Sequence, residues 1–131
     1  MKDYSILKQW NETYNGAAIY ALVGSNGIRY IGQARKLQSR LNSHRIEFNK
    51  IYKKDNCISS ENAKIIKAIK DGVTFTVEIL IKLPPNKTTI NYLRYYERYY
   101  LEQFGGYDNT YNKGYINMPR WDYAPFNEVL I

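Results

Sequence analysis

The sequence predicts an α+β fold, a small three-stranded antiparallel sheet flanked by helices, within one domain of 131 residues. Three short segments have the apolar pattern of buried or half-buried strands: residues 17–23, 28–32 and 73–83. Three longer segments repeat apolar residues at helical spacing: residues 35–51, 61–71 and 88–104. A loop over residues 52–60 separates the first two helices, Gly72 ends the second helix, and Pro84-Pro85 ends the third strand. A further short helix is expected within residues 1–15.

The first two predicted strands form a hairpin whose loop decides where two tyrosines point. A two-residue loop would place Tyr20 and Tyr30 on opposite faces of the sheet. A three-residue loop over residues 25–27, with Gly27 in the left-handed conformation, places them on the same face. That register also sets Tyr20 opposite Gly32, whose missing side chain leaves room over the ring. We therefore predict the three-residue loop.

The helix over residues 35–51 carries two polar side chains within its apolar stripe. The stripe consists of Leu37, Leu41, Phe48 and Ile51. Arg40 and His44 fall inside it, four residues apart, and so face the sheet. Each residue has an ordinary structural explanation. His44 would be a core histidine whose hydrogen bonds are satisfied, and Arg40 an arginine whose guanidinium reaches solvent from the edge of the stripe. Their common direction, toward the sheet that carries both tyrosines, favours a functional site.

The last predicted helix places a carboxylate where an apolar side chain is expected. Glu97 projects into the middle of a stripe formed by Ile90, Leu93, Tyr100, Leu101 and Phe104. A buried ionised carboxylate costs several kcal/mol unless it is paired or binds a metal. Two arrangements would stabilise the Glu97 carboxylate: a salt bridge to Arg40, or a bound Mg²⁺ or Mn²⁺ ion. Magnesium often takes only one or two protein carboxylates and completes its shell with water and phosphate oxygens.

The charge of the chain favours a polyanionic partner. Lys and Arg number 19 against 12 Asp and Glu, a formal net charge of +7. Candidate nucleic-acid contacts are Arg35 and Lys36 at the start of the first predicted helix, and Lys64 and Lys67 on the second. A solvated helix face would give the same lysine pattern. No stretch approaches the ~18 apolar residues of a membrane span, so we expect no membrane partner.

Further features limit the class of protein. Cys57 is the only cysteine, which excludes an internal disulfide and a cysteine-based zinc site. The first residues lack a signal-peptide pattern, so a cytoplasmic location is expected.

The candidate residues resemble the motifs of the GIY-YIG nuclease family. The first motif is written here Ala18-Ile19-Tyr20, with Ala in place of the family's Gly, and the second Tyr30-Ile31-Gly32. Arg40 follows the second tyrosine by ten residues, and His44 follows by four more. Order and spacing agree as well as residue types.

The resemblance extends over roughly residues 17–117, so residues 1–131 are expected to form a single nuclease domain. The stretch 96–100, Tyr-Glu-Arg-Tyr-Tyr, is similar to the segment that carries the family's metal-binding glutamate, here Glu97. The family ends its core with an Asn after a Gly-Tyr pair, which corresponds to Asn117, with Asn112 as the alternative. Residues 118–131 are expected to pack on the core as a tail. The further histidine of some homing-type members is missing.

The resemblance implies a sheet with helices on both sides, and a metal-dependent DNA endonuclease that leaves 5′-phosphate and 3′-hydroxyl ends. Tyr20 is expected to act as general base or to position water, its pKa lowered by Arg40 and one bound Mg²⁺ or Mn²⁺ ion. His44 would relay the proton or hold the phenol. Arg40 would hold the scissile phosphate, and Tyr30 a phosphate oxygen or the water network. The cation on Glu97 would neutralise the 3′ leaving oxygen.

Two alternatives to a DNA-cleaving enzyme remain. A non-cleaving DNA-binding module on the same fold would lack the arginine or the glutamate, and both are present. An RNA-directed or ribosome-associated basic protein is the other. Within the enzyme interpretation, we expect a phage or mobile-element enzyme or a small restriction endonuclease, in a bacterial or phage-infected cell. Cleavage of both strands by one site requires a homodimer or successive nicking.

Overall fold

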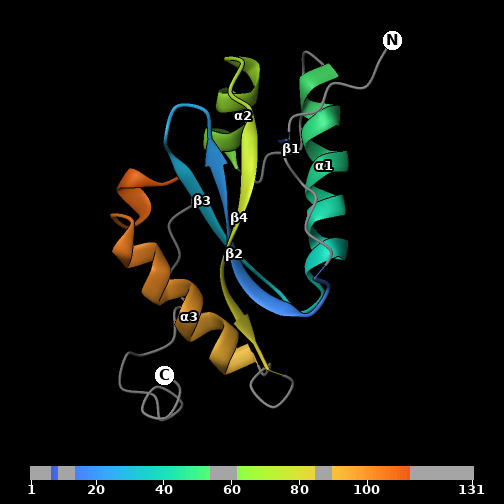
Figure 1. Ribbon diagram of the computed structural model, residues 1–131. Helices are drawn as coiled ribbons and strands as arrows, with labels where there is room; N and C mark the ends of the chain where they lie inside the picture. The colour runs from blue at the N-terminus through green and yellow to red at the C-terminus, as the bar shows by residue number, and fades with distance from the viewer. Residues whose placement is uncertain (1–6, 9–13, 54–61, 85–89, 113–131) are drawn as a thin grey trace.

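Three antiparallel strands form the centre of the fold, with helices on both of its faces (Figure 1). The computed structural model describes residues 7–8, 14–53, 62–84 and 90–112. The central strands are β2 (Ala17–Gly24), β3 (Arg29–Ala34) and β4 (Phe75–Leu83). The order in the sheet is β1-β4-β2-β3, so β3 is an edge strand. The predicted α+β class is confirmed.

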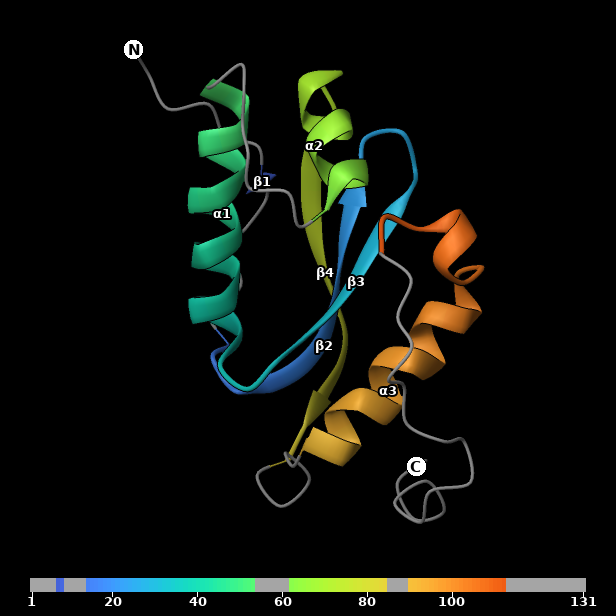
Figure 2. The ribbon, with the colours of Figure 1, turned by 180° about the vertical axis from the view of Figure 1, so that it is seen from behind.

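The helices divide between the two faces of the sheet (Figure 2). α1 (Leu37–Lys53) and α2 (Ala63–Lys70) cover one face. α3 (Ile90–Gln103) covers the other, and a short 3₁₀ helix, η2 (Tyr107–Asn109), follows it. Because β2 lies between β4 and β3, residues Ala17–Leu22 are buried on both faces. The helices begin and end within about three residues of the predicted limits.

The hairpin between β2 and β3 has the predicted register. Tyr20 lies opposite Gly32, and Leu22 lies opposite Tyr30. The amide of Gly24 donates to the carbonyl of Ile28 at 2.8 Å, which closes a loop of residues 25–27. Gly27 has a φ of 89°, in the left-handed region that favours glycine. Both tyrosines therefore lie on the face that α1 covers, as predicted.

A core cluster lies on each side of the sheet. On the side of α1 and α2 it includes Leu22, Leu37, Leu41, Phe48 and Phe75. On the side of α3 it includes Ile19, Ile31, Leu83, Leu93 and Leu101. Alternate residues of the strands supply the two clusters, as the period of a strand requires. Each helix is therefore held in place by one face of the sheet.

One predicted element is wrong where the structure describes it. We expected a helix within residues 1–15, but Leu7–Lys8 form β1, a two-residue strand parallel to β4. The reason is that β4 offers an unpaired edge, and pairing with it satisfies backbone groups on both segments. The predicted tail over residues 118–131, Asn117 and Cys57 lie outside the described residues.

Candidate active site

The candidate site centres on a hydrogen bond between a tyrosine and the histidine. Tyr20 of β2 is fully buried, and its hydroxyl lies 2.6 Å from Nε2 of His44 on α1. The ring of His44 also lies edge-on to Tyr30 of β3, with centroids 5.7 Å apart. Three elements that are separate in sequence thus bring two phenols and an imidazole together, as the sequence predicts.

Glycine at position 32 is what makes this packing possible. A Cβ atom there would lie 2.5 Å from both Cζ and the hydroxyl oxygen of Tyr20. That distance is far below van der Waals contact. The tyrosine ring therefore occupies the space that any other residue at position 32 would fill, as the register predicts.

The imidazole of His44 is neutral at pH 7. Burial lowers its pKa to about 3, and the nearby positive charge of Arg40 acts in the same direction. Only 7% of the residue is exposed. In the tautomer that carries its proton on Nδ1, the neutral ring accepts a hydrogen bond from the Tyr20 hydroxyl at Nε2. The phenol oxygen then keeps lone pairs for a second hydrogen bond.

Burial works against the lowered pKa that the sequence predicts for Tyr20. Burial raises the pKa of Tyr20, and Tyr30 adds to the rise, although Arg40 acts to lower it. Burial also raises the pKa of Tyr30, where Glu97 adds to the effect. Arg40 acts on Tyr20 in the expected direction, but the loss of water around a phenol in the core outweighs it. The effect of a bound cation, the other part of the expectation, stays a prediction. A free phenolate at Tyr20 is therefore disfavoured.

Arg40 lies at the solvent end of this group. It is exposed on α1, yet its positive charge is close enough to both Tyr20 and Tyr30 to act on the pKa of each, in the lowering direction. We predicted a position inside the apolar stripe, whereas the side chain runs along its edge and reaches water. Its position lets one cation act on the phenols and on an external anion at once.

Glu97 approaches from the opposite face of the sheet. It lies on α3, and Nε2 of Gln33 on β3 donates a hydrogen bond to its Oε1 at 2.8 Å. Burial raises the pKa of Glu97 to about 7, and the hydrogen bond from Gln33 and the charges of Arg40 and Arg94 oppose that rise. Within the described ranges no ion pair joins Glu97 to Arg40. Of the two arrangements that the sequence allows for Glu97, the salt bridge to Arg40 is therefore not formed.

An open hollow connects the two faces around the edge strand. It has a volume of about 530 Å³. Its lining residues come from β3, α1, α3 and the segment before α1: Gln33, Ala34, Arg35, Lys36, Ser39, Arg40, Ser43 and Leu93. The hollow thus joins the partner of Glu97 to the arginine whose charge acts on both phenols. Arg35 and Lys36 are exposed at this hollow, where the sequence predicts phosphate contacts.

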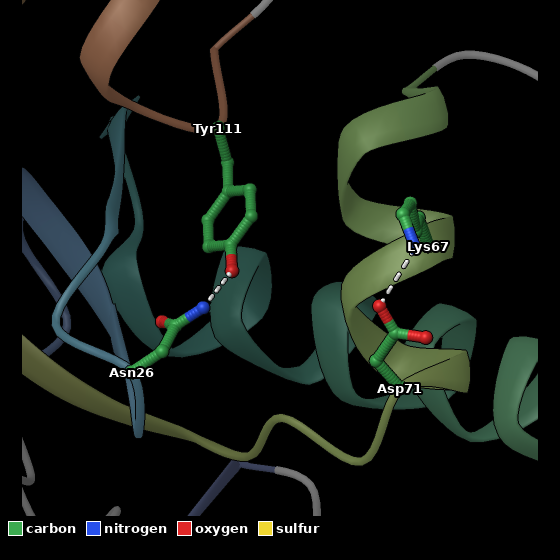
Figure 3. A network of polar contacts seen from close by, with 4 residues as sticks. All are labelled: Asn26, Lys67, Asp71 and Tyr111. Atoms are coloured by element: carbon green, nitrogen blue, oxygen red, sulfur yellow. Dashed lines mark hydrogen bonds and ion pairs between the residues drawn. The ribbon is translucent and has the colours of Figure 1, made fainter.

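The predicted lysines of α2 lie elsewhere. The ammonium of Lys64 donates to the carbonyls of Tyr107, Thr110 and Asn112, at 2.6, 3.2 and 3.1 Å. All three of its N–H groups are used by these carbonyls. Its phosphate contact stays a prediction. Lys67 pairs with Asp71 at 3.0 Å on the surface (Figure 3). Its phosphate contact stays a prediction.

A second hollow, of about 440 Å³, lies beside α2 and η2. At its rim Asn26 donates to the hydroxyl of Tyr111 at 2.8 Å, and Lys67 pairs with Asp71 (Figure 3). The polar groups drawn in Figure 3 bind one another. Its lining includes none of the phenol, imidazole and guanidinium groups described above.

Asn112, the alternative to Asn117, has a backbone partner. Its side-chain oxygen accepts from the amide of Ile31 at 2.9 Å, and its side-chain nitrogen donates to the carbonyl of Ile31 at 2.8 Å. It thus pairs with the free edge of β3 as a neighbouring strand would. Asn112 stabilises the strand that carries Tyr30 and Gln33 and has a structural role.

Glu97 is a suitable ligand for one hard cation. The described residues hold no group of three or more His, Cys, Asp and Glu side chains that could bind a metal. A single carboxylate is enough for Mg²⁺ when water and phosphate oxygens complete its shell. The raised pKa indicates a carboxylate short of positive charge, which a cation would supply.

Sequence reasoning missed Gln33 and Arg94. Gln33 follows Tyr30-Ile31-Gly32 directly on the edge strand, which was the available signal. Arg94 precedes Glu97 by one helical turn, and its charge acts on that carboxylate.

Comparison with protein-family models, curated proteins and solved structures finds no match for this chain. In the part of the chain that the structure describes, no helix is long and apolar enough to cross a membrane. A function for the chain must therefore be argued from motif spacing and site geometry.

Proposed function

We propose that this chain is a GIY-YIG-type endonuclease that hydrolyses DNA phosphodiester bonds with one Mg²⁺ or Mn²⁺ ion. One observation carries the proposal: the 2.6 Å contact between Tyr20 and neutral His44, beside the exposed guanidinium of Arg40. These residues occur in the order and spacing of the family motifs that the sequence resembles. Glu97 supplies the carboxylate. It lies on the opposite face of the sheet and accepts a hydrogen bond from Gln33 of the edge strand β3.

Tyr20 and His44 act in this proposal as a proton relay. The attacking water gives its proton to the oxygen of Tyr20 while the phenol proton passes to Nε2 of His44, so no free phenolate forms. The water oxygen bonds to phosphorus, and the bond from phosphorus to the 3′ oxygen breaks. That oxygen takes a proton from solvent, which leaves a 5′-phosphate and a 3′-hydroxyl.

Substrate binding makes His44 a better proton acceptor. The positive charge of Arg40 helps to keep the pKa of His44 near 3, together with burial. A phosphate bound to Arg40 offsets that charge and places an anion near the ring, so the pKa of His44 rises toward its ordinary value. Arg40 also stabilises the charge that develops on the phosphate oxygens. A divalent cation at Glu97 would stabilise the departing 3′ oxygen.

The cations near the edge strand suit a DNA strand. Arg35, Lys36 and Arg40 line the hollow, and Arg94 of α3 lies close enough for its charge to act on Glu97. We infer that the strand crosses the edge of β3 between α1 and α3, with phosphates on either side of the scissile bond held by the cations. The formal charge of +7 favours the same partner.

The test is a pair of substitutions assayed by plasmid nicking. Arg40→Ala and Glu97→Ala should each abolish Mg²⁺-dependent cleavage while circular dichroism shows a folded protein. Glu102→Ala is the matched control, because Glu102 lies on the same helix and pairs with Arg98 at the surface, at 3.2 Å. Full activity of either site variant would contradict the assignment.

The non-cleaving DNA-binding module is distinguished in the same assay. It would bind plasmid and leave it intact with or without Mg²⁺. Sequencing the ends cut from a randomised DNA library would separate a restriction endonuclease from a phage nuclease of low specificity. Measuring cleavage rate against protein concentration would detect a homodimer.

A further inference from the structure

The hydrogen bond between Gln33 and Glu97 fixes the position of the carboxylate. Nε2 of Gln33 donates to Oε1 of Glu97 at 2.8 Å. Gln33 lies opposite Ile19 in the sheet register, so its side chain leaves β3 on the face that α3 covers. It also lines the hollow together with Arg40. The hydrogen bond thus joins β3 to α3 beside the hollow in which a phosphate would bind.

The donor in this bond is a neutral amide. It holds one oxygen of Glu97 without neutralising the charge, so the carboxylate can still attract a cation. Arg40 is close enough for its charge to act on Glu97, yet among the described residues the two form no ion pair. Without Gln33 a flexible glutamate side chain would be free to turn toward that guanidinium. Both groups would then be less available to a substrate.

We propose that Gln33 is a positioning residue that holds Oε1 of Glu97 and presents Oε2 to the divalent cation. Gln33 acts through Glu97 and does not itself react. The inference rests on the cation-dependent cleavage proposed above. Outer partners of metal ligands generally act in this way, by fixing the direction of the ligand.

The test measures Mn²⁺ binding directly, by electron paramagnetic resonance of the free ion, on the full chain. Gln33→Met keeps the length of the side chain and removes the donor, and should raise the Kd for Mn²⁺ about tenfold. Gln33→Asn keeps an amide that is too short to reach, and should give a similar loss. Gln38→Met is the matched control. Its amide donates to the carbonyl of Tyr14 at 3.0 Å, and its loss should leave the Kd unchanged.

Cleavage kinetics provide a second readout that a purely structural role would not give. Gln33→Met should lower kcat at limiting Mg²⁺, recover at saturating Mg²⁺, and keep the KM for DNA. If the wild type binds Mn²⁺ and cuts while both Gln33 variants bind Mn²⁺ equally well, the role of Gln33 is wrong and the proposed function stands. If the wild type neither binds Mn²⁺ nor cuts, the proposed function fails and the inference fails with it.

Discussion

Replacing Glu97 with glutamine should change how the stability of the protein depends on pH. The variant keeps the shape of the side chain and removes the group that titrates. Burial raises the folded pKa of Glu97 from 4.5 to about 7. Between these values the folded wild type holds a proton that the unfolded chain has lost, so the free energy of unfolding falls as the pH rises. The contribution of Glu97 is complete below pH 4.5 and is lost by about pH 7.

The size of this effect follows from the shift in pKa. A rise from 4.5 to about 7 corresponds to about 3 kcal/mol, at about 1.36 kcal/mol per pKa unit. Glu97 is only partly buried, so screening by solvent reduces this to about 1–3 kcal/mol. The variant should gain that amount relative to the wild type between pH 4.5 and 7.

His44 contributes with the opposite sign. Its folded pKa is lowered from 6.5 to about 3, so its stabilisation is complete above pH 6.5 and is lost as the pH falls. In the wild type the two slopes oppose each other between pH 4.5 and 6.5. Glu97→Gln removes one slope and leaves the loss of stability on acidification that His44 causes.

The assay is urea unfolding followed by far-ultraviolet circular dichroism, without divalent cations, at several pH values from about 4 to 8. Glu102→Gln is the control and should follow the wild type at each pH. Mg²⁺ at pH 7 should stabilise the wild type and not Glu97→Gln. Parallel curves for the wild type and Glu97→Gln would refute the raised pKa, and with it the account of Glu97 as a partly buried carboxylate short of positive charge.

Three further substitutions test other parts of the account. Gly32→Ala should lower the free energy of unfolding by about 1–3 kcal/mol in urea titration, because its Cβ would lie 2.5 Å from Tyr20; wild-type stability would contradict the tight packing. Lys64→Met should lower the free energy of unfolding by about 1–3 kcal/mol, because three carbonyls lose their donor, and should leave DNA affinity unchanged if these bonds are its whole role; weaker DNA binding in a folded variant would support the predicted phosphate contact. Arg35→Gln should weaken DNA binding in fluorescence anisotropy and lower the slope of log affinity against log salt by about 1, and an unchanged slope would exclude Arg35 from the interface.

The parts of the site set by local geometry could be predicted from the sequence. The left-handed glycine at position 27 fixes the hairpin register, and the register puts Tyr20 and Tyr30 on one face. Helical phase alone turns His44 toward that face, where it meets Tyr20 at 2.6 Å. Each inference required only the residue period of a helix or strand, or the length of one loop, within a few neighbouring residues.

The parts set by distant contacts could not be predicted. Gln33 and Glu97 are 64 positions apart, and their bond depends on how α3 packs against an edge strand. Lys64 could be placed on an outer helix face, but its three carbonyl partners belong to a segment more than 40 residues away. The raised pKa of Tyr20 has the same origin, because burial is a property of the whole fold.

Incubation of the purified chain with supercoiled plasmid tests the central claim most directly. With Mg²⁺ we predict nicked and then linear DNA, and with EDTA intact plasmid. DNA ligase should reseal the nicks without prior treatment, since the products carry 5′-phosphate and 3′-hydroxyl ends. Plasmid that is bound but never cut, at any Mg²⁺ or Mn²⁺ concentration, would contradict the account and favour a non-cleaving DNA-binding protein.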